Sequence, residues 1–471
     1  MTLPRIDLPE DTPLTEELPI PANQYIGGRL YSDPLDSDEL PDVNPLNPTE
    51  QFVFSCNIPR SAFGGAMLPA EATTVHPARV SLYGHGLLGS QSEGRGQAQL
   101  KRFANEHNFS FCMTDWIGMS HFDLANVAIL LADMSNFPSL ADRAQQGFLN
   151  KMFLARLLVD PNGFSADPAF QHEGEPLIDP SHVFYDGNSQ GGIMGGALVA
   201  LSPDIHRGSL GVVGMNYSTL LSRSVDFAPF GAIYYTAYPE SLDQQTTFSL
   251  IQMLWDRAEN NGYAQHLGDG QTQHPWVGLA NRPLPDLPAG AYDESAGPFA
   301  AGIARMPQKE VLLHPAYGDH QVTHWSAEVM ARTVGANGAD AYYRSPEAFG
   351  TADGSVQYTY SSIEDFFAQR TPDTLDFFAL GLLDYADAQA IAGSAYILWD
   401  EGKTEAPPTS NTFPAADDFD PHEYPRRTVA ARCQKARFLR ADGRVIDTSQ
   451  MSNANDTPCP MRDGSGMAWS P

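Results

Sequence analysis

Short apolar runs alternate with amphipathic stretches along much of the chain, beginning near residue 79. Runs of this length, each followed by residues with helical periodicity, are typical of a mostly parallel sheet whose strands are connected by helices. The pattern therefore predicts an α/β fold with helices flanking the sheet. The expected core strands lie at residues 80–83, 109–114, 183–185, 210–213, 311–313 and 396–399.

Apolar residues at helical spacing occupy the segments between these strands. Leu100, Phe103 and Ala104 would share one face of a helix between the first two strands. The same spacing predicts a long helix that includes residues 148–157 and a further helix over residues 193–201. Each predicted helix thus follows a predicted strand, as parallel strand connections require.

Two intervals interrupt the alternation of strands and helices and are expected to be insertions. The first is rich in aromatic residues and contains a predicted helix near residues 248–255, so we expect it to form a lid or cap. An extended arm is expected before the core, because the first residues are rich in proline and aspartate. The expected parts are an arm (1–50), core (51–214), lid or cap (215–308), core (309–333), second insertion (334–393), core end (394–430) and C-terminal tail (431–471).

Composition supports a globular protein, since 42% of residues are apolar and 18% are charged. The formal net charge of −29 argues against nucleic acid or an anionic membrane as the main partner, because both attract basic surfaces. No apolar run approaches the roughly 18 residues that a membrane-spanning helix needs. We therefore expect a protein without a membrane span.

The compartment and the cysteines leave several possibilities. Residues 1–13 contain no apolar h-region, so the chain as given carries no signal peptide, and a chain already trimmed would look the same. The four cysteines would allow two bridges. Cys433 and Cys459 are the favoured pair, and Cys112 is interpreted as a small buried hydrophobe. Strong acidity with little lysine favours a secreted or periplasmic protein.

A possible nucleophile lies between a predicted strand and a predicted helix. Gly187-Asn188-Ser189-Gln190-Gly191 has the spacing G-x-S-x-G, which occurs in nucleophile elbows that hold a serine on a strained turn. Glycine two residues before and after the serine permits close approach of neighbouring backbone. The alternative is a glycine-rich turn with an exposed serine.

An acyl-transfer enzyme also needs backbone N–H groups directed at the developing oxyanion. The glycine-flanked turn after the first strand can supply the amide of Leu87, and Gln190 can supply the second amide. His85 in the same turn could instead be a base. The order of serine, acid and histidine along the chain favours a base nearer the C-terminus.

The acid and the base are expected after the serine. Asp319 follows the strand at residues 311–313, at the strand end where α/β sheets build sites, while Asp226 is the rival acid after the preceding strand. The alternative for Asp319 is a turn or helix-capping residue. His422 follows the last predicted strand, between two prolines that restrict its loop, and the alternative is a surface histidine.

A metal site is not predicted, although three histidines lie near Asp319 in the sequence. His314, His320 and His324 have no accompanying cysteine or acidic set at ligand spacing. We therefore expect neither a metal nor a cofactor.

These residues resemble the α/β-hydrolase superfamily, whose members include serine esterases and lipases, over roughly residues 79–427. The chain is also similar to a group of large bacterial members, and its Ser-Gln elbow looks like that of the much smaller cutinases. Asp319 and His422 are farther apart than a minimal member of the fold needs, which the insertion at residues 334–393 would explain. The narrower similarity rests on Thr114-Asp115-Trp116-Ile117-Gly118-Met119, Gly318-Asp319-His320-Gln321-Val322 and Asp420-Pro421-His422-Glu423.

The resemblance implies a carboxylic-ester hydrolase in which Ser189 attacks, His422 is the base and Asp319 orients it. Its substrate would be a small or polymeric ester. Trp116 and Trp255 are candidate contacts for an apolar or aromatic ester group, or they simply pack the inserted segment. The alternatives are an amidase or thioesterase with the same triad and an inactive scaffold used for binding.

Overall fold

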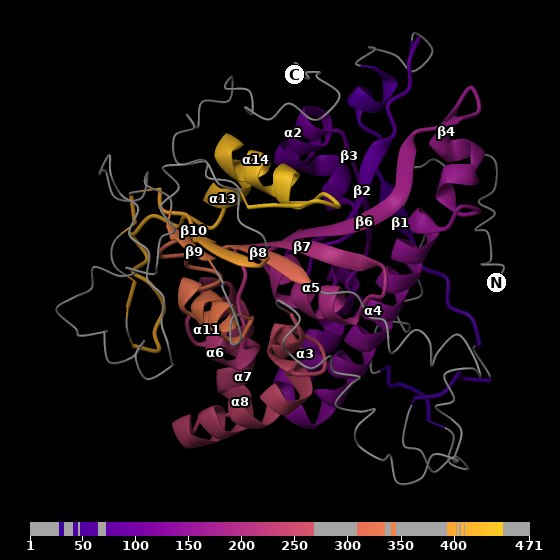
Figure 1. Ribbon diagram of the computed structural model, residues 1–471. Helices are drawn as coiled ribbons and strands as arrows, with labels where there is room; N and C mark the ends of the chain where they lie inside the picture. The colour runs from indigo at the N-terminus through magenta and orange to yellow at the C-terminus, as the bar shows by residue number, and fades with distance from the viewer. Residues whose placement is uncertain are drawn as a thin grey trace, which may run out of the picture.

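The central feature of the computed structural model is one sheet of eight described strands, in the order β1-β3-β2-β6-β7-β8-β10-β9 (Figure 1). β1 pairs with β3 antiparallel, and every other pairing in this sheet is parallel. This mostly parallel sheet confirms the predicted α/β class. The strands are β1 (Phe54–Cys56), β2 (Ala78–Gly84), β3 (Phe109–Thr114), β6 (Ile178–Asn188), β7 (Ile205–Gly211), β8 (Glu310–His314), β9 (Ala341–Arg344) and β10 (Ala395–Leu398).

The structure describes part of the chain. That part comprises residues 28–32, 41–45, 48–64, 72–267, 309–334, 341–344, 393–401, 403–404, 407–408 and 410–445. Most of the predicted arm, the end of the predicted lid from residue 268, most of the second insertion and the tail after residue 445 therefore lie outside the described residues.

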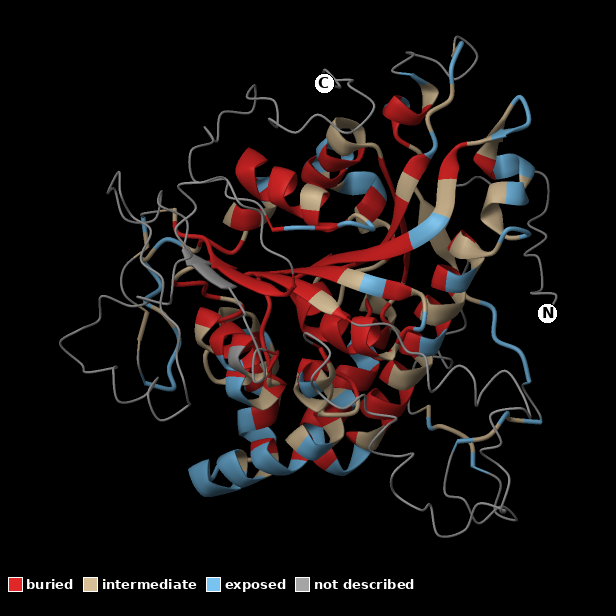
Figure 2. Cartoon of the chain, viewed as in Figure 1, coloured by how far each residue is buried: buried red, intermediate tan, exposed pale blue. Residues whose placement is uncertain are grey.

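Alternate residues of the strands pack on opposite faces of the sheet, as strand geometry requires. Leu82 and Tyr185 belong to one hydrophobic core, whereas their neighbours Tyr83 and Phe184 belong to the other. Both faces are covered, so the central strands are buried along most of their length (Figure 2). This explains why these strands appear as continuous apolar runs in the sequence.

Helices cover both faces of the sheet (Figure 1). The first face carries α3 (Leu124–Ala132), α4 (Pro138–Val159), α5 (Gln190–Leu201), α6 (Tyr217–Leu221), α7 (Ala228–Ala237), α8 (Ser241–Trp255) and α11 (His324–Val334). The second face carries α1 (Glu93–Gly96), α2 (Ala98–His107), α13 (Tyr424–Arg427) and α14 (Val429–Phe438).

Short elements complete the described fold. A small hairpin consists of β4 (Gln171–His172) and β5 (Glu175–Pro176). The 3-10 helices are η2 (Arg60–Phe63), η4 (His121–Asp123), η5 (Met134–Asn136), η6 (Phe164–Ala166), η7 (Pro168–Phe170), η8 (Val225–Phe227), η9 (Asn260–Gly262) and η10 (Ala264–His266). No helix in the described part combines the length and apolarity needed to cross a membrane.

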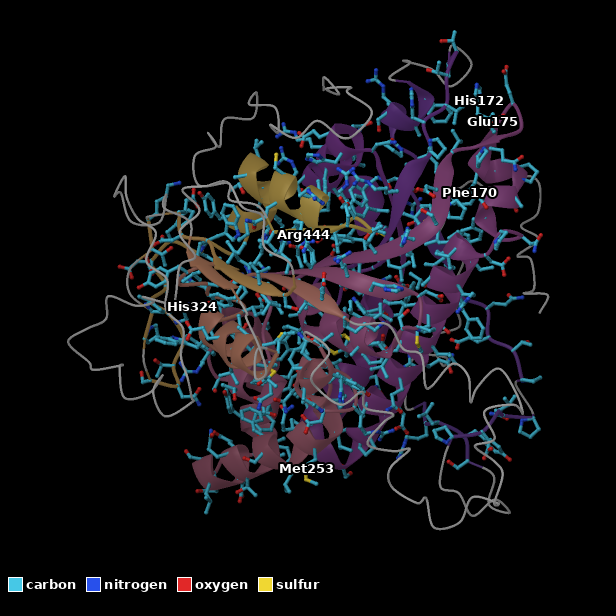
Figure 3. The ribbon with its side chains drawn as sticks, viewed as in Figure 1. Phe170, His172, Glu175, Met253, His324 and Arg444 are labelled. Atoms are coloured by element: carbon cyan, nitrogen blue, oxygen red, sulfur yellow. A yellow bond between two sulfur atoms is a disulfide. The ribbon has the colours of Figure 1, made fainter. Side chains whose placement is uncertain are left out.

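The described part of the first predicted insertion is helical, and we name its helices within residues 217–255 the cap. α6, η8, α7 and α8 occupy residues 217–255, and α7 packs against α3 of the core. The far side of α8 faces solvent, where Met253 is 69% exposed (Figure 3). The second predicted insertion is not wholly separate from the core, because β9 at Ala341–Arg344 extends the main sheet beside β10.

The predicted tail begins inside a helix of the core. α14 covers the second face of the sheet, and its Lys435 makes a buried ion pair of 2.8 Å with Asp186 of β6. Gln434 on the same helix lies 2.6 Å from Nε2 of His314 at the end of β8. The expectation of a loop-like tail from residue 431 is therefore wrong as far as residue 438. The sequence of α14 shows no clear apolar face, because several of its polar side chains are buried and pair with polar or charged partners. The apolar pattern therefore did not predict this helix.

The interpretation of Cys112 as a lone hydrophobe is also wrong. Cys112 is buried and forms a disulfide with Cys56, its directly paired neighbour across β1 and β3. Cys433 is disulfide-bonded as well, but it lies in α14 rather than in a loop, and Cys459 lies outside the described residues. Strand pairing brought Cys56 and Cys112 together, which no local pattern shows.

Candidate active site

Ser189 lies at the turn between β6 and α5. Its backbone has φ 60° and ψ −125°, a conformation that a residue with a side chain adopts only under strain. The turn is crowded, since a Cβ on Gly191 would lie 2.2 Å from the carbonyl oxygen of Gly84. A Cβ on Gly187 would lie 2.6 Å from the oxygen of Gly191. The two glycines of G-x-S-x-G are thus required because a Cβ at either position would clash with neighbouring atoms. The serine has the strained strand-to-helix conformation of a nucleophile elbow.

His422 and Asp319 form a buried pair. Nδ1 of His422 lies 2.9 Å from Oδ1 and 2.8 Å from Oδ2 of Asp319. Asp319 follows β8, and its Oδ1 also accepts the amides of Gln321 at 2.8 Å and Val322 at 2.9 Å. The carboxylate is therefore held from two sides, so it can orient the imidazole.

Arg426 on α13 determines which ring nitrogen of His422 carries the proton. Its Nη2 lies 3.2 Å from Nε2 of His422. A guanidinium can only donate, so Nε2 must accept and the proton must be on Nδ1, which donates a hydrogen bond to the carboxylate of Asp319. This tautomer leaves a lone pair on Nε2, which is what a general base requires.

Asp420 connects the loops that carry the pair. Its Oδ1 accepts the amide of His422 at 3.1 Å and that of His320 at 3.2 Å. Its Oδ2 accepts Nε2 of Gln321 at 2.8 Å. Sequence reasoning placed Asp420 within the His422 motif but assigned it no role. Its position two residues before His422 was the available signal, because aspartate often accepts amides two residues on.

The turn after β2 carries Leu87 and is fixed at both ends. The amide of Gly86 donates to Oε1 of Glu93 at 3.0 Å. The amide of Leu88 donates to Oε1 of Gln190 at 3.2 Å. Burial raises the pKa of the Glu93 carboxyl, while the Gly86 amide and Arg426 lower it. Sequence reasoning did not find Glu93, for which no motif gives a signal.

Gln190 also lies at the position expected of an oxyanion donor. It is the first residue of α5, and the first amides of a helix have no intrahelical acceptor. Its side chain connects the turn at Leu88 to the loop at Met119, whose carbonyl accepts Nε2 at 2.8 Å. Leu87 and Gln190 line the same cavity as Ser189.

His85 has a structural environment rather than that of a base. It is fully buried, with Nδ1 2.9 Å from the oxygen of Gly86 and Nε2 accepting the amide of Trp116 at 2.8 Å. Burial lowers the pKa of His85 to about 3, so the ring is neutral and both nitrogens are engaged. It joins the turn after β2 to the end of β3.

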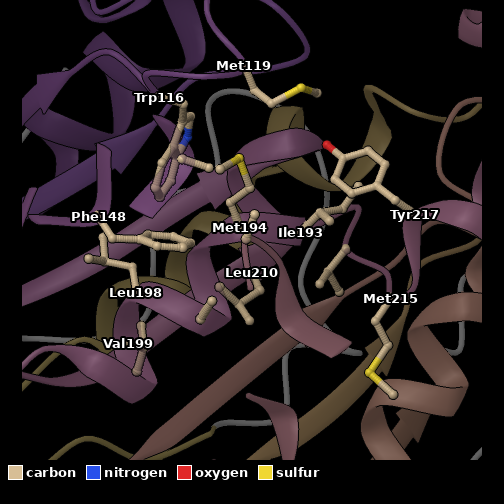
Figure 4. Packing of buried hydrophobic residues seen from close by; sticks show 14 of the residues in the cluster. Trp116, Met119, Phe148, Ile193, Met194, Leu198, Val199, Leu210, Met215 and Tyr217 are labelled. Carbon is tan, nitrogen blue, oxygen red and sulfur yellow. The ribbon is translucent and has the colours of Figure 1, made fainter. Parts of the chain in front are cut away.

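The cavity beside Ser189 is largely apolar and is bounded by core and cap together. Trp255 of α8 lines it, as expected of a substrate contact. Trp116 does not line this cavity, because it is buried in the core. The ring centroids of Trp116 and Phe148 are 5.7 Å apart (Figure 4). Nζ of Lys151 lies 4.0 Å from the ring centroid of Trp116. The lining residues further include Met119, Leu130, Met134, Phe137, Ile193, Tyr217, Leu220, Phe227, Phe230 and Ile251.

Asp226, the rival acid, lies in η8 and lines this cavity. Burial raises the pKa of its carboxyl, and the charge of His422 lowers it. Of the two carboxylates, it is Asp319 whose oxygens contact the imidazole nitrogen. The structure thus brings both candidates near His422 but places Asp319 in contact.

The three histidines considered as a metal cluster have separate environments. His314 contacts Gln434, Nε2 of His320 lies 3.5 Å from Asp418, and Nδ1 of His324 accepts the amide of Gly318 at 3.3 Å (His324 is labelled in Figure 3). Over the described residues, no group of three or more metal-ligating side chains is assembled.

The sequence matches no family model and no curated protein. Among solved structures, the chain is similar to an acetyl xylan esterase from a Thermoanaerobacterium species, with 14% identity, a TM-score of 0.33, and coverage of 56% of this chain and 67% of the esterase. It is also similar to S-formylglutathione hydrolase from Agrobacterium tumefaciens, with 12% identity, a TM-score of 0.29, and coverage of 62% and 80%.

A third similar structure is the acylaminoacyl peptidase of Pyrococcus horikoshii, with 11% identity and a TM-score of 0.28. The match covers 55% of this chain and 31% of the peptidase, so it spans about a third of that protein. Likenesses this distant carry no argument about activity. What the site does is therefore inferred from its own residues.

Proposed function

We propose that this chain is a serine hydrolase of the α/β-hydrolase type that cleaves carboxylic esters through an acyl-enzyme. The observation that carries the proposal is the pairing of Asp319 with Nδ1 of His422, which leaves a lone pair on Nε2, together with the strained turn at Ser189. Gln321 and Val322, whose amides bind Asp319, line the cavity that Ser189 lines. The serine, the acid and the cavity thus belong to one region.

In the proposed reaction, Oγ of Ser189 attacks the ester carbonyl while Nε2 of His422 takes its proton. The amides of Leu87 and Gln190 stabilise the oxyanion, and Asp319 stabilises the imidazolium. The imidazolium then protonates the leaving alkoxide as the C–O bond breaks. Water, activated by the same histidine, releases the acid and restores Ser189.

Arg426 has to give up its contact with Nε2 during this cycle. Once Nε2 holds the serine proton it has no lone pair to accept a guanidinium N–H. Nη1 of Arg426 already pairs with the carboxylate of Glu423 at 3.1 Å, so the guanidinium keeps a partner when Nη2 leaves Nε2. The resting contact is therefore compatible with turnover.

A fluorophosphonate probe and short p-nitrophenyl esters test the proposal. We expect the probe to label Ser189, as read by mass spectrometry, and Ser189→Ala to abolish the label. Ser189→Ala and His422→Ala should each lower kcat by roughly 10⁴ to 10⁶, and the double variant should be scarcely worse, because the members act as a unit. Activity should persist in EDTA.

Wild-type turnover in either variant would refute the assigned roles, and failure of the probe to react would favour a binding protein. Loss of activity in EDTA that zinc or calcium restores would refute the metal-free mechanism. Hydrolysis of the matched amide or thioester in preference to the ester would assign the same triad to an amidase or thioesterase.

A further inference from the structure

The guanidinium of Arg426 is enclosed beside the base of the candidate triad. Its side chain is 10% exposed, and its Nη2 lies 3.2 Å from Nε2 of His422. Burial of a charged group is unfavourable unless its N–H groups have acceptors. Nη1 has one in Glu423, but Nε of Arg426 is buried without a hydrogen-bond partner among the described residues. The site therefore holds a donor that the resting structure leaves unused.

The unused donor and the contact with His422 lie on the same edge of the guanidinium. Nε and Nη2 of an arginine share one edge of the planar group, so they present N–H bonds in the same direction. Arg432 shows this within the same chain, because its Nε and Nη2 donate to the two oxygens of Glu106 at 2.7 Å and 3.0 Å. The edge of Arg426 that carries the unpartnered Nε therefore faces His422. An acceptor that approaches Nε2 of the histidine also approaches this edge.

In ester hydrolysis, the atom that must approach Nε2 is the leaving oxygen, which takes its proton from the imidazolium. A general acid has to lie within about 3.2 Å of the atom that it protonates. An oxygen that close to Nε2 of His422 can lie equally close to Nη2 of Arg426, since the two nitrogens are 3.2 Å apart. Nη2 needs a new acceptor in this step, because Nε2 then holds a proton. The oxygen on the alcohol side of the ester is the acceptor that both groups can share.

We propose that Arg426 is a catalytic residue that donates a hydrogen bond to the leaving oxygen of the ester. As the C–O bond breaks, its electron pair passes to this oxygen and Nε2 of His422 gives it a proton, while Arg426 keeps all of its own protons. The guanidinium stabilises the negative charge that develops there before the proton arrives. This inference rests on the proposed ester hydrolysis. It implies that Arg426 matters most for esters of aliphatic alcohols, whose alkoxides are strong bases.

The test compares p-nitrophenyl, p-methylphenyl and ethyl butanoate, which form the same acyl-enzyme and differ in the basicity of the leaving group. Their kcat/KM values report acylation, so the shared hydrolysis of the acyl-enzyme does not enter them. A loss of control over the His422 tautomer in Arg426→Met would affect all of these esters alike, because each needs the proton of Ser189 removed. Arg426→Met should in addition lower the ratio of kcat/KM on the ethyl ester to that on the p-nitrophenyl ester about 10- to 100-fold, with the p-methylphenyl ester in between.

Arg427→Met is the matched control. Arg427 follows Arg426 on α13 and donates to the same Glu423 through Nε at 3.0 Å and Nη2 at 2.7 Å, but its side chain is 57% exposed. This variant removes an equal charge and should leave the ratio unchanged. Arg426→Lys keeps the charge but not the edge with two donors, so its ratio should fall less. It replaces Arg426→Met in the comparison if that variant fails to fold.

An unchanged ratio in Arg426→Met, with or without a common loss on every ester, would overturn the inference and leave Arg426 its role in the tautomer of His422. An equal fall of the ratio in Arg426→Met and Arg427→Met would overturn it too, because net charge would then explain the effect. Wild type that cleaves the p-nitrophenyl ester but not the ethyl ester would overturn it and leave the proposed function in place. Failure to cleave any of these esters would count against the proposed function itself, so the two failures are distinguishable.

Discussion

Two side chains that are 103 residues apart in the sequence meet at the candidate site, His422 and Asp319. Their neighbours support this contact in different ways, since Asp420 holds the loop amides and Arg426 faces Nε2. Asp226 is near enough to interact electrostatically with His422 but lies on the cavity wall. At the scale of residues, the two carboxylates therefore have different predicted roles.

Asp319→Asn should lower kcat on an uncharged ester by about 10⁴, because an amide cannot stabilise the imidazolium and favours the wrong tautomer. Asp226→Asn should cost far less on the same ester, since its carboxylate does not contact the ring. Steady-state kinetics with purified variants measure both effects. If Asp226→Asn lost activity while Asp319→Asn stayed active, the catalytic acid would be Asp226 instead of Asp319.

At the scale of elements, Glu259 connects the cap helices to the core. Oε1 accepts the amide of Tyr217 at 3.2 Å and Nε2 of Gln252 at 2.7 Å, so α6 and α8 share one carboxylate. Oε2 accepts the amide of Asn261 at 2.9 Å. Glu259 is fully buried, and burial raises its pKa to about 7. The stability of the cap should therefore depend on pH.

The sign of this dependence follows from the raised pKa of Glu259. Below the ordinary value of 4.5 both folded and unfolded states hold the proton, and between 4.5 and about 7 the unfolded state loses it first. Stability is thus lost as pH rises to about 7. Relative to Glu259→Gln, wild type should lose up to about 3 kcal/mol between pH 5 and pH 8.

Thermal unfolding of both proteins at the two pH values measures this difference. Glu240→Gln, an exposed position at the start of α8, is the control and should show no such change. A difference between wild type and Glu259→Gln that stays constant with pH would contradict the prediction.

At the scale of the whole molecule, a disulfide bond joins the edge strand of the sheet to its neighbour. Cys56 and Cys112 join β1 to β3 over a sequence separation of 56 residues. β1 is the antiparallel edge strand, and its three residues pair with β3 alone. The disulfide therefore restricts a long loop of the unfolded chain and anchors the edge.

The double change Cys56→Ala and Cys112→Ala should lower the free energy of unfolding by about 4 kcal/mol, as the loop-closure entropy of this separation predicts. Urea unfolding without reductant measures it. Reductant should then lower the midpoint of wild type more than that of the variant, which keeps only the disulfide of Cys433. Equal midpoints for the two proteins without reductant would show that the bridge adds no stability.

Local patterns in the sequence were enough to predict the central strands and the serine turn. β3 was predicted at its observed bounds, and the predicted strands at residues 80–83, 183–185 and 311–313 lie inside β2, β6 and β8. The central part of these strands is buried on both faces, so burial selects apolar residues at most positions there. The turn at Ser189 was predictable because steric crowding admits only glycine at fixed offsets.

Tertiary structure decided the features that depend on partners far away in the chain. β1, β9 and α14 are short or polar, and they are stable because the sheet, a disulfide and the pair of Lys435 with Asp186 hold them. Asp319 and Asp226 follow neighbouring strands and look alike in sequence, so only the approach of the His422 loop distinguishes them. The sequence likewise does not distinguish Trp116 from Trp255 as a substrate contact. One is enclosed by the core and the other faces a cavity, because packing between elements, and not residue type, determines what a side chain can touch.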